Sequence, residues 1–159
     1  MLGTRRAGSD RRRGGHVGPV TASSRTLQHV GEWKVELRAN TVDELFVELA
    51  RVVADATGPR GSPPAPGEWE HVELAARDYA TLLVDWANEL IGRSEVVARA
   101  YGTVRNLIIE SAPGGPARLS ADVRGEPVME WASPLKAATY HDAAVERQGD
   151  WRAIVLFDV

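Results

Sequence analysis

Cysteine is absent from the 159-residue sequence, and only two lysines, at positions 34 and 136, stand beside seventeen arginines. Without cysteine the chain can form no disulfide, thiolate zinc site, iron–sulfur cluster or cysteine nucleophile. No apolar run approaches the about 20 residues that span a bilayer, and no apolar segment follows the N-terminal arginines. We therefore expect no membrane helix and no secretory signal, and we predict a cytoplasmic location.

Recognisable catalytic signatures are also missing. The sequence contains no glycine-rich phosphate loop, no nucleophile elbow and no His-x-x-x-His metal pair. Its serines fall in predicted loops or at element edges without a recognisable base nearby. We predict that the chain is not an enzyme, and a metal-dependent hydrolase ranks last because no positioned general base can be named.

Charge is distributed unevenly along the chain. Five arginines and one aspartate give residues 1–24 a net charge of +4, so residues 25–159 carry −7 of the total of −3. An acidic body argues against a nucleic-acid clamp, which needs basic surface to displace counterions. It fits either docking onto a basic partner or an ordinary solvated surface.

The N-terminal segment has no hydrophobic periodicity and is rich in Gly, Ser and Arg. This composition predicts a disordered, arginine-rich tail over residues 1–25. The run Arg11-Arg12-Arg13 fits either a contact with RNA or a solvated tail, the commoner case. Residues 26–159 are predicted to form a single domain.

Hydrophobic periodicity predicts a strand and a helix at the start of this domain. Residues 27–37 alternate between apolar and polar positions, which is typical of a half-buried strand. Residues 41–59 carry apolar side chains at helical spacing, with Thr41 and Glu44 placed to form a capping box.

A second amphipathic helix is predicted over residues 78–92, with Asp78 as its N-cap and Gly92 as its end. The chain closes with two strands around "RQGD", a pattern typical of an antiparallel hairpin. Because strands outnumber helices and follow one another, we predict an α+β fold with two helices packed on largely antiparallel sheet. Further strands are expected at 69–75, 95–101, 103–110 and 117–123.

The closing hairpin ends on an acid at the rim of an apolar strand. If Gln148 and Gly149 form a two-residue turn, then Thr139 lies opposite Asp158 and His141 opposite Leu156, and the three polar residues share one face. A longer loop would break this register. A carboxylate beside a core must be paired, hydrogen-bonded or metal-bound unless the strand end is solvated, so Asp158 marks either a site or a frayed end.

Four stretches, in the same order, resemble the archease family. "LKAATYHDAAVERQGDWRAIVLFDV" (135–159) is similar to its C-terminal signature. "LLVDWANELI" (82–91), "RGEP" (124–127) and "TVDELFVELA" (41–50) resemble its Leu-Leu-Val-x-Trp-Leu-Asn-Glu-Leu helix, its Gly-Glu-Pro segment and its first helix. The resemblance covers about residues 27 to 159.

The resemblance implies a non-catalytic accessory protein for a GTP-dependent RNA ligase. Such a ligase joins a 2′,3′-cyclic phosphate or 3′-phosphate end to a 5′-hydroxyl in tRNA splicing or RNA repair, and archeases promote its guanylylation and multiple turnover. The implied partner is the ligase, with RNA met only through it and no membrane involved. The alternative is a diverged, chaperone-like protein-binding module without metal chemistry.

The resemblance also implies a divalent-metal site. Carried over by position, its members are Glu32, Asp158 and the backbone of Val159, with Ca²⁺ expected and Mg²⁺ or Mn²⁺ as alternatives. The family reads His-Thr-Ala-Asp-Ile-Gly where this chain reads "HVGEWK" (29–34), so His29 is kept and the metal-binding Asp becomes Glu32. Supporting roles are expected for His29, Thr139 and His141.

Overall fold

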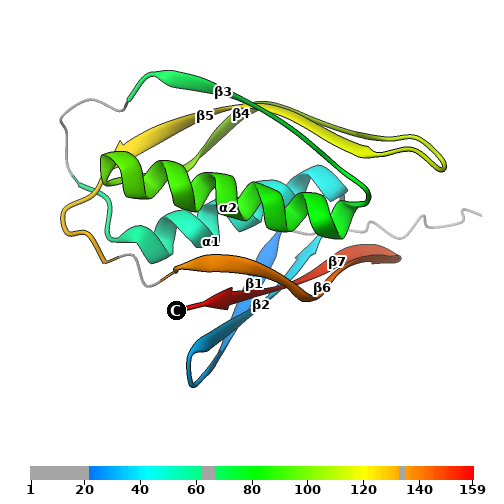
Figure 1. Cartoon of the computed structure of the whole chain (residues 1–159), viewed down its shortest axis with the longest axis horizontal. Coiled ribbons are helices and arrows are strands. Elements are labelled where there is room, and N and C mark those ends of the chain that lie inside the picture. The colour runs from blue at the N-terminus through cyan, green and yellow to red at the C-terminus, as the bar shows by residue number, and fades with distance from the viewer. Residues whose placement is uncertain (1–21, 62–66, 133–134) are drawn as a thin grey trace, which may run out of the picture.

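The structure, a computed structural model, describes residues 22–61, 67–132 and 135–159. Two helices lie between two antiparallel sheets, which confirms the predicted α+β class (Figure 1). Most of the predicted tail falls outside the described residues, but the first strand already begins at Ser23, inside the segment that we assigned to the tail. No described helix is long and apolar enough to cross a membrane.

The first sheet has four strands in the order β1-β2-β7-β6. They are β1 (Ser23–His29), β2 (Glu32–Ala39), β7 (Asp150–Asp158) and β6 (Ala137–Gln148). The single strand predicted over 27–37 is therefore wrong. The segment is a hairpin with a two-residue turn, Val30-Gly31, in which Gly31 has φ +79°. The alternation of apolar and polar residues continues through this turn, so the sequence reads as one strand.

The second sheet has three strands in the order β3-β5-β4, and all three come from residues 69–127, with a helix between the first and second along the chain. They are β3 (Trp69–Ala76), β5 (Ala117–Pro127) and β4 (Arg99–Ser111). The strand that we predicted over 95–101 is wrong in its first half, because residues 95–97 still belong to a helix.

The first helix, α1 (Val42–Thr57), begins as predicted. The Thr41 hydroxyl accepts a hydrogen bond from the Glu44 backbone N–H at 3.3 Å, and the Glu44 carboxylate reaches back to the Asn40 N–H at 3.1 Å. The capping box is thus present, with its return bond displaced by one residue from the N-cap.

The second helix, α2 (Tyr79–Val97), begins at the predicted cap but runs past the predicted end. The Asp78 carboxylate accepts the Thr81 N–H at 2.7 Å. Gly92 does not end the helix, because a glycine costs only about 1 kcal/mol in a helix interior and the surrounding turns are well bonded. The Ser94 hydroxyl donates to the Leu90 carbonyl, and the chain leaves the helix at Ala98 in the left-handed region.

The helices form the middle layer and hold the core. α2 contacts strands of both sheets, and the indole N–H of the fully buried Trp86 donates to the Phe46 carbonyl of α1 at 2.9 Å. One continuous cluster of buried apolar side chains includes residues of both helices and both sheets. Burial of this layer from two sides supplies the hydrophobic stabilisation of the fold.

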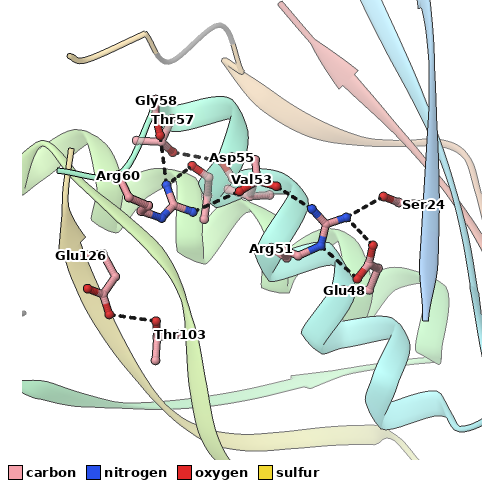
Figure 2. Close-up of polar contacts among 11 residues, drawn as sticks. Ser24, Glu48, Arg51, Val53, Asp55, Thr57, Gly58, Arg60, Thr103 and Glu126 are labelled. Atoms are coloured by element: carbon pink, nitrogen blue, oxygen red, sulfur yellow. Dashed lines mark hydrogen bonds and ion pairs between the residues drawn. The ribbon is translucent and has the colours of Figure 1, made fainter. Parts of the chain in front are cut away.

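Two arginines form hydrogen bonds and an ion pair that stabilise α1 and connect it to β1 (Figure 2). Arg51 pairs with the buried Glu48 at 2.6 Å and donates to the Ser24 hydroxyl of β1 at 3.1 Å. Arg60 caps the end of the helix by donating to the carbonyls of Ala54 at 2.7 Å and Gly58 at 3.1 Å. Carbonyls that the helix leaves free are therefore satisfied by a side chain.

Candidate functional site

Glu32 and Asp158 face each other across neighbouring strands. The β2–β7 register pairs them directly, and directly paired residues of antiparallel strands project from the same face. The alternate positions Val35 and Phe157 are buried in the core, so the two carboxylates stand on the exposed outer face. Two predicted ligands that are distant in sequence are therefore adjacent.

The end of β7 is held by backbone hydrogen bonds on both sides. The Lys136 N–H donates to the Asp158 carbonyl at 2.8 Å, and the Val159 N–H donates to the Gly31 carbonyl of the β1–β2 turn at 3.3 Å. These bonds fix the backbone on which Asp158 and Val159 sit. The strand end is not frayed.

His29 occupies the next position in the same row. The β1–β2 register pairs it with Glu32, so one row of the sheet contains His29, Glu32, Asp158 and Ala137. The His29 side chain lies outside the described part of the chain, and its supporting role stays a prediction.

The predicted register of the closing hairpin is wrong. A single residue, Gly149, separates the paired Gln148 and Asp150, which shifts the pairs from there to Ala144–Ile154 by one position. A bulge then places residues 140–143 opposite Val155 alone, with Asp142 at φ +53°. Sequence spacing could not reveal this insertion of extra residues.

The correction moves both supporting residues away from Asp158. Thr139 lies opposite Leu156, and Ala137 takes the place that we predicted for Thr139. His141 lies in the bulge, exposed, with its Nε2 3.3 Å from the Asp142 carboxylate. The structure therefore brings Glu32 and Asp158 together, but places neither Thr139 nor His141 directly opposite Asp158.

The chemistry of the paired residues fits a hard divalent cation. Carboxylate and backbone oxygens are the donors that Ca²⁺ and Mg²⁺ prefer. Neither Glu32 nor Asp158 forms a side-chain hydrogen bond or ion pair with any described residue. Among the side chains that the structure describes, which do not include that of His29, no group of three or more His, Asp or Glu could hold a metal.

A second polar cluster covers the outer face of the three-stranded sheet. His71 lies 3.0 Å from Asp122 and 3.2 Å from Glu73, and Asp122 also accepts from Arg105 and Asn106. The pKa of His71 is raised, mainly by its hydrogen bond to Asp122 and secondly by that to Glu73. The same contact with His71 lowers the pKa of Asp122. Because the members satisfy one another, this cluster is less suited than the Glu32–Asp158 pair to bind a ligand.

Comparison with known proteins identifies the family. The model of the Archease protein family matches residues 25–159. The chain belongs to the archease family. Protein archease of Methanosarcina acetivorans is 28% identical over 138 residues, and that of Methanosarcina mazei is 29% identical over 143; each alignment covers 84% of this chain and 93% of the relative.

Solved archease-family structures share the fold. The solution structure of protein 1598 of Methanobacterium thermoautotrophicum matches with a TM-score of 0.66 and 19% identity, covering 86% of this chain and 98% of the other. The crystal structure of a Thermotoga maritima archease, described as a possible chaperone, matches with a TM-score of 0.57 and 19% identity, covering 84% and 94%. At this identity the likeness establishes the fold alone.

The archease-like stretch 82–91 has a structural role that the sequence did not reveal. The Asn88 side chain bonds both backbone groups of Ala138, donating to its carbonyl at 3.0 Å and accepting its N–H at 2.8 Å. Tyr140, in the bulge, donates to the Asp85 carboxylate, which raises the pKa of the phenol. The spacing of Asp85 and Asn88, on one helical face, was the available signal. Together they hold β6 against α2.

We expect Asn88→Ala to lower the free energy of unfolding by about 2 kcal/mol, since it leaves two partly buried backbone groups of β6 without partners. Urea denaturation would measure this loss, and amide exchange at Ala138 should accelerate. Glu95→Ala, an exposed change on the same helix, is the control and should shift stability by no more than about 0.5 kcal/mol. Equal stability of the two variants would contradict the role of Asn88.

Proposed function

We propose that this chain is a non-catalytic activator of a GTP-dependent RNA ligase, the enzyme that joins a 3′-phosphate or 2′,3′-cyclic phosphate to a 5′-hydroxyl. It would promote guanylylation of the ligase and its multiple turnover in tRNA splicing or RNA repair. The supporting observation is the direct pairing of Glu32 with Asp158 on an exposed sheet face of an archease-family chain. A cytoplasmic location accords with this role.

In this proposal Glu32, Asp158 and the Val159 backbone hold a divalent ion, Ca²⁺ first and Mg²⁺ or Mn²⁺ as alternatives. When bound, such an ion would neutralise charge on nucleotide phosphates. The chain itself positions the two carboxylates, because the Lys136–Asp158 and Gly31–Val159 backbone bonds fix the strand ends that carry them. An open sheet face leaves coordination positions for the ligase and its nucleotide.

A joining assay with the host ligase tests the proposal. Added protein should raise multiple-turnover joining and leave single-turnover joining by pre-guanylylated ligase unchanged. Asp158→Asn should remove most of the stimulation, since the amide keeps the shape but loses the charge. Asp150→Asn, at the opposite end of β7, is the matched control and should stimulate as the wild type does. Full stimulation by Asp158→Asn would refute the role of the carboxylate pair.

Metal affinity can be tested separately through Glu32. Glu32→Asp restores the shorter carboxylate that the family carries, and we expect it to bind Ca²⁺ several-fold more tightly, whereas Glu32→Gln should bind at least about tenfold more weakly. Isothermal titration with Ca²⁺, Mg²⁺ and Mn²⁺ would measure both changes. Identical titrations for wild type, Glu32→Asp and Glu32→Gln would place the metal elsewhere.

A second candidate is a chaperone-like module that binds other proteins without metal chemistry. It is favoured by large apolar side chains that stand exposed, among them Val96 at the end of α2, with 84% of its surface accessible. The Thermotoga maritima relative is described as a possible chaperone. Suppression of aggregation of a client protein, equal in EDTA and in Ca²⁺ and unaffected by Asp158→Asn, would favour this candidate over the first.

A further inference from the structure

The outer face of the four-stranded sheet has an apolar centre. Among the described elements, the strands of this sheet contact only one another and the two helices, which lie on its inner side (Figure 1). Three half-buried side chains of the outer face, Leu27, Ile154 and Leu156, neither belong to the core cluster nor pack on it. The solvated face of an antiparallel sheet normally carries polar residues, so an apolar centre points to a covering partner.

The two central strands, β2 and β7, place four pairs of residues on this outer face. From one end to the other they are Glu32–Asp158, Lys34–Leu156, Glu36–Ile154 and Arg38–Arg152. The face therefore has an acidic end and a basic end.

Both ends bring like charges together. Glu32 lies beside Asp158 at the acidic end. Arg38 lies beside Arg152 at the basic end, and like charges directly opposite one another destabilise a sheet. Glu32, Asp158 and Arg38 form no ion pair with any described residue, and Arg152 forms one, with its Nε 3.5 Å from the Asp150 carboxylate. A divalent cation can compensate the acidic end, but only an anionic group can compensate the basic one.

The order of charges along β2 is complementary to its own reverse. From position 32 to position 38 the outward side chains are acidic, basic, acidic and basic, so reversing the strand sets each acid over a base. On β7 the same reversal sets Asp158 over Arg152. It also sets Leu156 over Ile154, and both are apolar. Two copies of this face therefore match when their strands run in opposite directions.

Only one two-fold arrangement of stacked faces satisfies these charges. A two-fold axis that runs across the strands places each acidic end over the basic end of the other copy. Glu32 then meets the partner's Arg38, and Asp158 meets the partner's Arg152. An axis that runs along the strands would set acidic end on acidic end. Aligned sheets stack about 10 Å apart at roughly 30°, and the central strands β2 and β7 are displaced least by this angle.

We propose that two copies of this chain associate through the outer face of the four-stranded sheet, with their strands antiparallel. In this dimer Arg38 and Arg152 of each copy cover the carboxylate pair of the other. The inference goes beyond the proposed function. Four strands about 4.8 Å apart and about seven residues long cover roughly 400 Å² per copy, which is the size of a transient contact. The dimer is therefore reversible and depends on protein concentration.

Sedimentation of the purified full chain in EDTA, over a range of concentrations, tests the proposal. The wild type should show a monomer–dimer equilibrium that weakens as salt rises from about 0.05 M to about 1 M, because salt screens the end charges. Arg38→Glu sets like charges together twice in each dimer and should raise the dissociation constant at least about tenfold. Ile154→Asp, in the apolar centre, should raise it as much.

An exchange of charges tests the register of the interface. Arg38→Glu combined with Glu32→Arg again sets opposite charges over each other, so the double variant should dimerise within about threefold of the wild type. Arg118→Glu reverses an exposed arginine on β5 of the other sheet and is the control, which should dimerise as the wild type does. Circular dichroism spectra that match the wild type separate lost association from lost fold.

Ca²⁺ links the dimer to the proposed metal site, and this arm alone rests on the proposed function. An ion on the carboxylate pair competes with the partner's arginines, so Ca²⁺ should raise the dissociation constant of the wild-type dimer. A dimer that forms in EDTA and is unchanged by Ca²⁺ would overturn the metal pair, while the interface stands. A wild type that stays monomeric at every concentration, or a double variant as weak as Arg38→Glu, would overturn the dimer and leave the activator role standing.

Discussion

Replacing Trp86 with alanine is expected to lower the free energy of unfolding by about 3–5 kcal/mol. Trp86 is fully buried in the helical layer, and its indole N–H is bonded to the Phe46 carbonyl. Since α2 contacts both sheets, there is no open side from which the structure can collapse into the cavity. The whole free energy of unfolding of a small domain is about 5–15 kcal/mol, so this loss is a large share of it. Urea denaturation followed by circular dichroism would measure it.

Trp151→Ala is the matched control for Trp86→Ala. Trp151 is only half-buried and packs edge-on against Tyr79, with ring centroids 5.8 Å apart. Its removal opens a space that solvent can enter, and we expect a loss of about 1–2 kcal/mol. Equal losses at the two positions would show that the helical layer is packed no more tightly than the sheet rim.

Replacing Gly58 with alanine is expected to lower the free energy of unfolding by roughly 3 kcal/mol or more. Gly58 ends α1 at φ +143° and ψ +167°, a region that essentially only glycine adopts. A Cβ there would also stand 2.1 Å from the Glu130 carbonyl oxygen, a backbone atom that cannot rotate away. The loop from 128 to 132 would therefore have to move.

Gly92→Ala offers the opposite expectation within the same chain. Gly92 lies inside α2, and a Cβ added there meets nothing within 4 Å. Alanine should therefore stabilise the protein by about 0.5–1 kcal/mol through helix propensity and a less flexible unfolded chain. Thermal unfolding of the two variants together distinguishes strain at Gly58 from a general sensitivity to lost glycine. A stable Gly58→Ala would contradict the close approach of the 128–132 loop.

The helices were the most predictable part of the fold, because their signals are local. Thr41 and Asp78 act as N-caps through hydrogen bonds to residues three positions later, a spacing that can be read from the sequence. The end of α2 was not predictable in this way. Gly92 weakens a helix without ending it, and the turns on either side decide the outcome.

The strand errors have a common physical cause. Val30-Gly31 turns the chain without breaking the alternation of apolar residues, so one strand was predicted where two exist. The bulge at residues 140–143 inserts residues that no composition signal marks. Register between strands is set by turn geometry and long-range packing, and small changes in either move every side chain that follows.

The adjacency of Glu32 and Asp158 could not be predicted from local sequence patterns. Glu32 and Asp158 came from resemblance to a family motif, and the β2–β7 pairing that makes them neighbours lies between strands at opposite ends of the domain. The stretch containing Asn88 was part of the same resemblance, but its bonds to Ala138 depend on tertiary packing.

The position of β7 in the centre of its sheet has a consequence for synthesis. The three-stranded sheet is built from the contiguous segment 69–127, whereas β2 must wait for residues 150–158 before it gains its inner neighbour. During translation the outer edge of β2 therefore stays unpaired until β7 has left the ribosome. The two carboxylates meet only once β7 has joined the sheet, so a nascent chain that stops before residue 158 could not present them as a pair.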